Sequence, residues 1–205
     1  MQQRIIEKTT ELFFKYGLKG VTMDDIASSL GVSKKTIYQY YSDKDSLVDA
    51  VVQAEIDRGE MECKQFLANS ENAIHEIFME MSMMQKMLST LNPFVLYDMQ
   101  KYYPNSFKKF DEHKNQFMYQ IIMQNIERGK KEELYRTEIN ADILAKLRIE
   151  SIFLVFNTDL FPPTKYSVLQ VSMEILNNFI HGMCTPKGLK QLLKYTTQSK
   201  TTNHL

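Results

Sequence analysis

The chain has 205 residues with 25 basic and 25 acidic side chains, so its formal net charge is zero. This length fits one or two domains with a substantial hydrophobic core. The balanced charge excludes a generally basic nucleic-acid-binding surface, and residues 1–50 are balanced in the same way. Any attraction to phosphate must therefore come from the local placement of a few side chains.

No apolar run approaches the roughly 20 residues that a membrane-spanning helix needs, and the N-terminus lacks the apolar core of a signal peptide. Cys63 and Cys184 are too few for a disulfide framework, and we expect them to be reduced packing residues of a cytoplasmic protein. Glycine and proline are scarce, and no segment alternates strongly as a strand does. We therefore predict an all-α fold.

A first helix is expected over residues 2–16, and two short helices joined by a glycine turn follow it. Thr22 and Ser33 can each cap a helix, and Thr22 with Asp25 has the spacing of a capping box. Gly31 lies between the short helices, where glycine adopts a left-handed conformation at little cost. The side chains expected beneath the helix crossing are Ile26, Leu30, Val32, Ile37 and Tyr40. This is the outline of a helix-turn-helix, whose second helix lies in the major groove of DNA.

The second helix of the pair is expected over residues 34–41 and is rich in hydrogen-bond donors. Lysine can reach guanine and glutamine can pair with adenine, whereas threonine and tyrosine hydroxyls more often hold phosphates. The donors are Lys34, Lys35, Thr36, Tyr38 and Gln39. Lys44, in the first turn of the next helix, is expected to hold a phosphate. The alternative is that the three lysines form only a solvated face.

The fourth helix is expected to begin after Ser42, which has the spacing of a capping box with Asp45. Its apolar positions continue to about residue 68. A helix of this length would belong to two domains at once. It is therefore the expected mechanical link between them.

Residues 4–50 resemble the DNA-binding domain of the TetR family of bacterial transcriptional regulators. The matching stretches are Ile5-Ile6, Leu12-Phe13-Phe14, Gly17, Gly20, Thr22-Met23-Asp24-Asp25-Ile26-Ala27, Gly31-Val32-Ser33-Lys34, Thr36-Ile37-Tyr38, Lys44 and Leu47. Tyr41 stands where the family usually has phenylalanine, so its ring either packs inward or adds a hydroxyl near a phosphate. The resemblance covers about a quarter of the chain.

The resemblance also implies which side chains meet DNA. Lys34, Lys35 and Tyr38 would touch bases or their flanks. The backbone contacts would come from Thr22, Thr36, Gln39, Tyr40 and Lys44. For Tyr40 this role conflicts with the core position expected from the helix pattern, and both interpretations stay open.

The apolar pattern of the remaining chain predicts further helices over residues 73–89, 105–128, 139–159 and 165–183, with a short helix between Pro93 and Pro104. Gly129 is expected to end the helix over 105–128. The chain has 13 methionines, a side chain that fills irregular gaps and adapts to varied ligands. Residues that could line a ligand cavity are Phe78, Met81, Met84, Phe94, Tyr97, Phe117 and Met118. A plain core is the alternative, because the cavity itself follows mainly from the family resemblance.

Residues 149–156 are apolar at all but two positions, and the helix over 165–183 has a wide apolar face. In the TetR family two late helices pack against their symmetry mates as a four-helix bundle. Residues 141–181 are therefore expected to form a twofold interface. The residues predicted to line it are Ile152, Phe153, Phe156, Met173, Leu176 and Ile180. The alternative is that these side chains are core within one chain.

These patterns predict a helix-turn-helix DNA-binding domain over residues 1–48 and a helical ligand-binding and dimerisation domain over residues 49–205. The predicted function is a ligand-responsive regulator of the repressor type that binds palindromic double-stranded DNA as a homodimer. The expected effector is largely apolar or aromatic. The alternative is a helical small-molecule-binding or scaffold protein that does not act through DNA. No catalytic motif, metal-ligand spacing or cofactor motif is recognisable, and neither an enzyme nor a membrane protein is expected.

Overall fold

The computed structural model describes the backbone of residues 1–202 and their side chains except those of Lys86, Thr90 and residues 198–202. The described chain is built from helices joined by turns, which confirms the predicted all-α fold. The first elements are α1 (Gln2–Tyr16), α2 (Met23–Leu30), α3 (Lys34–Tyr38), α4 (Lys44–Asn69), α5 (Ala73–Thr90) and α6 (Val95–Tyr102). They are followed by α7 (Pro104–His113), the π-helical turn η1 (Lys114–Met118), α8 (Tyr119–Lys131), α9 (Ala141–Leu154), α10 (Val168–Met183) and α11 (Pro186–Thr202).

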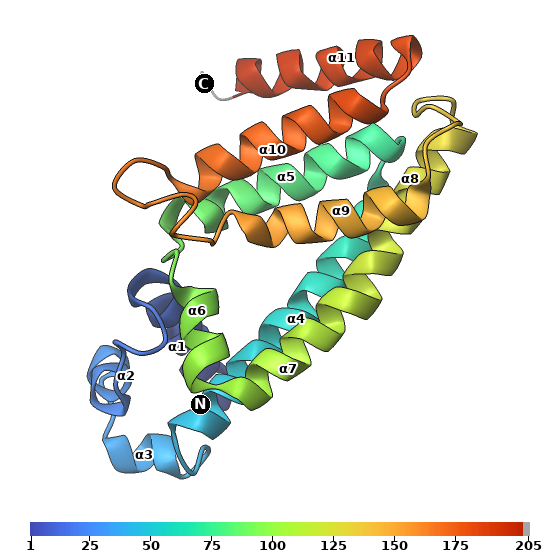
Figure 1. The fold of residues 1–205 in the computed structure, drawn as a ribbon. Coiled ribbons are helices and arrows are strands. Elements are labelled where there is room, and N and C mark those ends of the chain that lie inside the picture. Colours follow the sequence, from blue (N-terminus) through green and yellow to red (C-terminus); the bar gives the residue numbers. More distant parts are fainter. Residues whose placement is uncertain (203–205) are drawn as a thin grey trace.

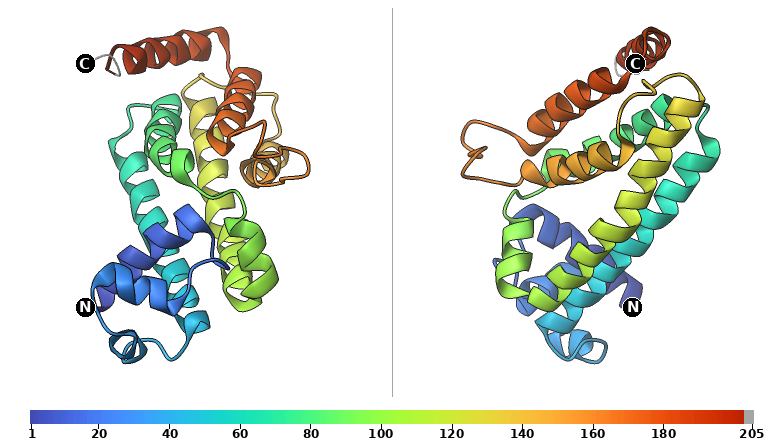
Figure 2. Two further views of the ribbon diagram at one scale, coloured as in Figure 1. Left: turned by 90° about the vertical axis from the view of Figure 1, so that its left-hand side faces the viewer. Right: turned by 45° about the vertical axis from the view of Figure 1, so that its right-hand side comes forward.

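Helices α1 to α3 form a small head at one end of the molecule (Figure 1). Helices α4 and α7 run side by side away from this head, and α8 continues the line of α7 through η1. Helices α5, α9, α10 and α11 lie stacked beyond them, with α11 at the end opposite the head (Figure 2). The chain therefore has a head and a larger helical bundle, and α4 belongs to both.

The local signals of the head are mostly confirmed. Thr22 accepts a hydrogen bond from the Asp25 amide, and the Asp25 side chain accepts one from the Thr22 amide, which completes the expected capping box. Gly31 has φ 66° and ψ 32°, in the left-handed region. Since a β-carbon disfavours that conformation, glycine is what allows the abrupt turn between α2 and α3.

The start of α4 and the length of α3 differ from the sequence prediction. Asp43 caps α4 through the Ser46 amide, so the box predicted from Ser42 lies one residue too early. Helix α3 ends at Tyr38 instead of residue 41 because the chain turns at residues 39–40. This turn exposes Tyr40 and buries Tyr41, so the core position expected for Tyr40 belongs to its neighbour.

In the bundle, Gly129 lies inside α8 and does not end it. An added β-carbon there would meet the Tyr135 ring at 2.0 Å, so this glycine is needed for close packing. Helix α9 is shorter at both ends than the predicted helix over 139–159, and α10 begins at Val168 instead of 165. Helix α11, which the sequence analysis did not predict, begins where Thr185 accepts a hydrogen bond from the Gly188 amide.

The buried apolar residues form three clusters. The first joins the head to the N-terminal part of α4 and to Val95, Met99 and Tyr103 of the α6 region. The second holds the far ends of α5 and α8 together with α9, α10 and α11, and the third lies where α5, α10 and residue 155 meet. The head core is therefore completed by residues far along the chain.

Candidate functional site

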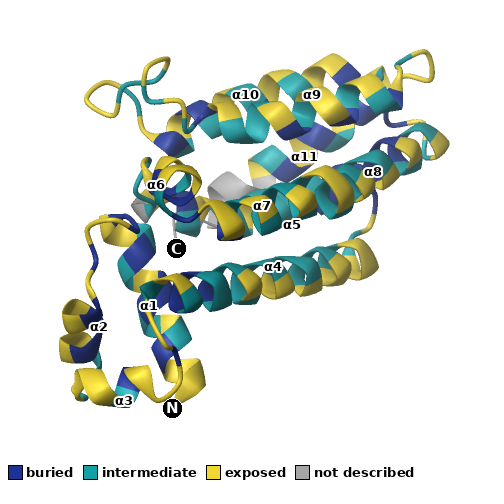
Figure 3. Ribbon diagram, turned by 60° about the horizontal axis from the view of Figure 1, so that its bottom comes forward, coloured by how far each residue is buried: buried dark blue, intermediate teal, exposed yellow. Residues whose placement is uncertain are grey.

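One buried side chain anchors helix α3 to the core of the head, and the other side chains of the helix are exposed or half-buried. Ile37 is completely buried in the head core, and Ser33 caps the helix by accepting a hydrogen bond from the Thr36 amide at 3.1 Å. Tyr38 on the helix and Tyr40 in the following turn are both 44% exposed. Figure 3 shows α3 as a mostly exposed rod at the edge of the head. Its outer surface is free to enter a groove.

The polar side chains of α3 differ in how far they are engaged within the head. Lys34 forms an exposed ion pair of 2.9 Å with Asp24, and this carboxylate raises the lysine pKa. The Thr36 hydroxyl lies 2.9 Å from the Ser33 hydroxyl. Lys35 is exposed and has no hydrogen-bond or ion-pair partner among the described residues. Lys35 is thus the cation of α3 that can meet a phosphate or a base without first breaking a contact.

Thr22 and Gln39 lie at the exposed edges of this surface. The Thr22 hydroxyl donates to the Asp25 carboxylate at 2.7 Å, so it already serves the start of α2. Gln39 follows α3 and is exposed. The structure therefore brings Thr22, Lys34, Lys35, Thr36, Tyr38, Gln39 and Tyr40 to the exposed part of the head.

Lys44 does not point outward as the sequence analysis expected. Its ammonium donates to the Leu18 carbonyl at 2.5 Å and lies over the rings of Phe13 and Tyr103. Burial lowers the pKa of this ammonium, and nearby carboxylates partly compensate. In this conformation Lys44 holds α4 to α1 and to the chain after α6, so the predicted phosphate contact would require this lysine to leave the Leu18 carbonyl.

The middle of the bundle forms a loose region, in which the side chains are only partly buried. Between residues 107 and 124 no side chain is fully buried, although this segment lies beside α4 and α9. The same is true of α4 beyond Val51 (Figure 3). The π-helical turn η1 lies within the loose segment, and such turns often occur at functional sites because they redirect side chains.

A network of polar side chains closes the far end of this loose region. Glu76 is only 2% exposed and lies 2.9 Å from the Arg128 guanidinium, which also pairs with Glu132 at 2.7 Å. Burial raises the pKa of Glu76, and the hydrogen bonds from Asn125 and Arg128 oppose that rise. Arg128 further donates to Ser70, which ties α8 to the end of α4. This network is structural because its donors and acceptors already satisfy one another.

The seven predicted ligand residues do not gather in one place. Phe94 and Tyr97 are exposed on α6, so they do not line the bundle interior. Phe78 lies against Tyr195 of α11, with ring centroids 5.6 Å apart. The partly buried members near the loose region are Met81, Met84, Phe117 and Met118. Sequence reasoning missed Glu80 of α5 and Arg148 of α9, two partly buried charged side chains that no motif marks.

Several predicted interface residues are core within one chain. Leu176 and Ile180 are buried in the second cluster, and Phe153 packs edge-on against Phe110 at 5.4 Å. Phe156 packs against the first and third clusters, while Ile152 and Met173 are partly buried. Leu176 and Ile180 are too deeply buried to contact a second molecule in this conformation. The interface role of the four partly buried residues stays a prediction.

The outer face of α9 instead carries an exposed apolar stripe. Ile143 is 61% exposed, Leu147 55% and Leu154 42%. A shallow groove beside this stripe is lined by residues of both α9 and α10, including Ile139, Leu144 and Phe179. Exposed apolar side chains in a row are typical of a contact surface.

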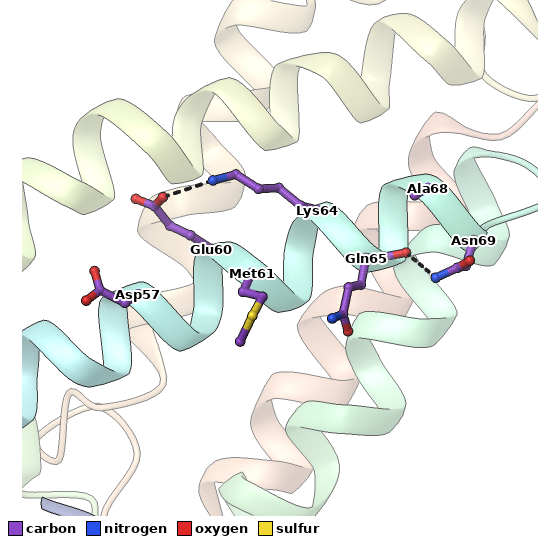
Figure 4. Close-up of a pocket in the computed structure, with 7 residues that line it drawn as sticks. All are labelled: Asp57, Glu60, Met61, Lys64, Gln65, Ala68 and Asn69. Carbon is purple, nitrogen blue, oxygen red and sulfur yellow. Dashed lines mark hydrogen bonds and ion pairs between the residues drawn. The ribbon is translucent and has the colours of Figure 1, made fainter. Parts of the chain in front are cut away.

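A second hollow lies along α4 and is lined by that helix alone (Figure 4). Its residues Glu60 and Lys64 form an ion pair along the helix, and Asn69 donates to the Gln65 carbonyl. An open surface on one helix does not enclose a ligand. Within the described part of the chain no group of acidic, histidine and cysteine side chains has a metal-binding arrangement, and no helix is long and apolar enough to cross a bilayer.

Comparison with known proteins places this geometry in a family. Residues 5–51 match the family model described as bacterial regulatory proteins, tetR family. The head of the chain is therefore similar to the DNA-binding domain of the TetR family. The chain is 27% identical over 184 residues to an uncharacterized HTH-type transcriptional regulator, YvaF of Bacillus subtilis, covering 89% of this chain and 95% of the relative. The matched segment contains the whole helix-turn-helix, so the head has the architecture of the DNA-binding domain of a transcriptional regulator.

Two solved structures extend the likeness to the fold of the bundle. A transcriptional regulator from Saccharomonospora viridis in complex with choline has a TM-score of 0.70 at 19% identity, with coverage of 90% of this chain and 97% of that one. FadR from Bacillus subtilis in complex with stearoyl-CoA has a TM-score of 0.63 at 14% identity, with coverage of 89% and 99%. Their ligands differ in size and charge, so the shared fold does not specify an effector.

Proposed function

We propose that this TetR-family regulator binds palindromic operator DNA as a homodimer and represses transcription until a small effector enters the bundle. The exposed outer surface of α3, with Lys35, Tyr38 and Gln39 on or beside a helix whose only buried residue is Ile37, is the observation that carries the proposal. A helix anchored from one side and exposed on the others suits entry into a major groove.

The absence of a net positive charge on a single head favours twofold assembly. Since residues 1–50 have no excess of basic side chains, one head alone would bind DNA only modestly. Two linked heads raise the effective concentration of the second binding event. We assign the dimer contact to the exposed α9 stripe, Ile143, Leu147 and Leu154, together with the neighbouring groove of α10.

Control by an effector requires that ligand binding differ between two arrangements of the heads. Helix α4 supplies the connection, because its first turns are buried with the head while the rest lies along the partly buried middle of the bundle. A coupling free energy of about 1–3 kcal/mol would change DNA affinity roughly 5- to 150-fold.

Selection of bound sequences from random duplexes tests this function. A palindromic consensus with half-sites about one helical turn apart is the expected result. Tyr38→Ala should then change the preferred bases, while Tyr16→Ala, which removes an exposed tyrosine of α1, should not. Recovery of no enriched sequence, or an enriched sequence without twofold symmetry, would refute the proposal.

A further inference from the structure

An ion pair joins the two helices of the helix-turn-helix on the exposed part of the head. The Lys34 ammonium lies 2.9 Å from the carboxylate of Asp24, which stands 10 positions earlier in the chain. The side chains of Lys34 and Asp24 are 43% and 71% exposed. Lys34 is the first residue of α3, and Asp24 lies in the first turn of α2. The ion pair therefore presents a donor and an acceptor side by side on the surface proposed to face DNA.

The local structure of α2 does not account for this contact. The neighbouring Asp25 completes the capping box, because its carboxylate accepts hydrogen bonds from the Thr22 amide at 2.8 Å and from the Thr22 hydroxyl at 2.7 Å. Among the described residues, Lys34 is the only hydrogen-bond partner of the Asp24 side chain. An acidic side chain in the first turn interacts favourably with the helix dipole, but that interaction requires no lysine beside it. Since an exposed ion pair also contributes little to stability, the two groups are available for a contact outside the chain.

A carboxylate on a DNA-facing surface can bind only a few groups of the duplex. The phosphates repel it, and in the major groove it can accept hydrogen bonds only from the amino groups of cytosine and adenine. The first residues of a recognition helix contact base edges, and Lys34 occupies that place. Because Asp24 lies within hydrogen-bond distance of Lys34, a base-pair edge that meets one side chain also meets the other.

The edge of a G·C base pair matches the ion pair in spacing and polarity. Guanine O6 accepts a hydrogen bond from cytosine N4, so these two atoms lie about 2.9 Å apart, as the Lys34 and Asp24 atoms do. One hydrogen of N4 forms the base pair, and the other faces the major groove. An ammonium has three donors, of which Asp24 takes one, and guanine offers O6 and N7 to the others. Every donor therefore finds an acceptor.

We propose that the Lys34–Asp24 ion pair reads one G·C base pair in each half of the operator, with Lys34 donating to guanine O6 and N7 and Asp24 accepting from cytosine N4. This inference rests on the proposed function, since it requires α3 to enter the major groove. An A·T pair also presents an amino group beside a carbonyl, but the thymine methyl group takes the place of the second acceptor. A reversed C·G pair exchanges the donor and the acceptor. Only one orientation of a G·C pair therefore fits.

Selection of bound duplexes by the wild-type chain and by Asp24→Ala tests the inference. The wild-type consensus should contain a G·C pair at which Asp24→Ala weakens the preference, while the other positions keep theirs. An A·T pair or a reversed pair at this position should weaken wild-type binding roughly 5- to 150-fold per half-site. Glu11→Ala is the matched control, because it removes a carboxylate from another exposed ion pair of the head, at 2.7 Å from Lys8. It should leave every base preference unchanged.

A modified base tests the Asp24 contact without any change in the protein. In N4-methylcytosine, a methyl group replaces the amino hydrogen that faces the major groove, and the base pair with guanine can still form. This base at the read position should lower wild-type affinity by at least about fivefold per half-site, and it should change the affinity of Asp24→Ala little. The wild-type result decides even where the variant does not fold.

Several outcomes would overturn the inference. They are an Asp24→Ala consensus equal to that of the wild type, a change of preference confined to A·T pairs, and a general rise in affinity without a change in preference. Equal wild-type affinity for cytosine and N4-methylcytosine is a further one. A palindromic operator that Asp24→Ala reads unchanged contradicts only this inference, whereas the absence of any enriched duplex contradicts the proposed function as well.

Discussion

The Lys44 ammonium lies 2.5 Å from the Leu18 carbonyl oxygen, which fixes the first turn of α4 to the end of α1. Lys35 has no such partner. These two lysines, nine positions apart in one head, therefore have different expected effects on DNA binding. Their replacement gives a matched comparison between an internal contact and a contact to phosphate or base.

Lys35→Ala should reduce the slope of log affinity against log salt concentration by about 1 for each bound head, because each phosphate contact releases counterions. Lys44→Met should leave that slope unchanged and lower the free energy of unfolding by about 1–3 kcal/mol, since it removes the hydrogen bond and the aromatic contacts of the ammonium. Fluorescence anisotropy at several salt concentrations and chemical denaturation measure these effects. A reduced slope for Lys44→Met would restore its assignment to phosphate.

Tyr41→Phe should raise the free energy of unfolding by about 1 kcal/mol, because the Tyr41 hydroxyl is buried and has no hydrogen-bond partner among the described residues. Urea denaturation of the full chain measures the change. Tyr40→Phe is the control, since its hydroxyl is on an exposed side chain and its removal should change stability by less than about 0.5 kcal/mol. Destabilisation by Tyr41→Phe would mean that the hydroxyl has a partner in solution.

Gly129→Ala should lower the free energy of unfolding by about 1–3 kcal/mol, since its β-carbon would overlap the buried Tyr135 ring. Gly59→Ala, inside α4, meets nothing within 4 Å and should raise stability by about 0.5–1 kcal/mol through helix propensity. Thermal denaturation compares the two. Equal effects of both substitutions would show that the close approach of Tyr135 to α8 is absent.

Leu147→Glu should convert the proposed dimer to monomers at micromolar concentration, because it places a charge in the middle of the exposed α9 stripe. Leu193→Glu is the matched control, since Leu193 is equally apolar and 62% exposed on α11. Sedimentation velocity reports the assembly state. A monomeric wild-type chain, or a dimer that survives Leu147→Glu, would contradict the assignment of the interface.

The head was predicted in most of its details because its signals are local. A capping box such as Thr22 with Asp25 and a left-handed glycine such as Gly31 depend on residues within one turn of each other. The failures in the bundle come from long-range packing. Glycine often follows the last residue of a helix, and Gly129 was predicted to do so. The close approach of the Tyr135 ring explains instead why this position inside α8 has no side chain.

The same difference between local signals and long-range packing applies to the functional residues. Exposure of Lys35 and Tyr38 follows from their place on a short helix, but the inward turn of Lys44 depends on the Leu18 carbonyl and on rings from α1 and residue 103. Helix α11 could have been found, since Thr185 followed by Pro186 is a common helix start. No sequence signal marked Glu80 and Arg148, because the partial burial of each depends on helices far apart in the chain.

The core of the head includes Val51 of α4 and Val95, Met99 and Tyr103 from the α6 region. A fragment cut at residue 48 would expose all the apolar surface that these side chains cover. Grafting this head onto the bundle of another regulator should therefore yield a stable chimera only if α4 and α6 travel with it. The DNA-binding head is therefore not an independent module, and residues 1–48 alone would not be enough to transfer it to another protein.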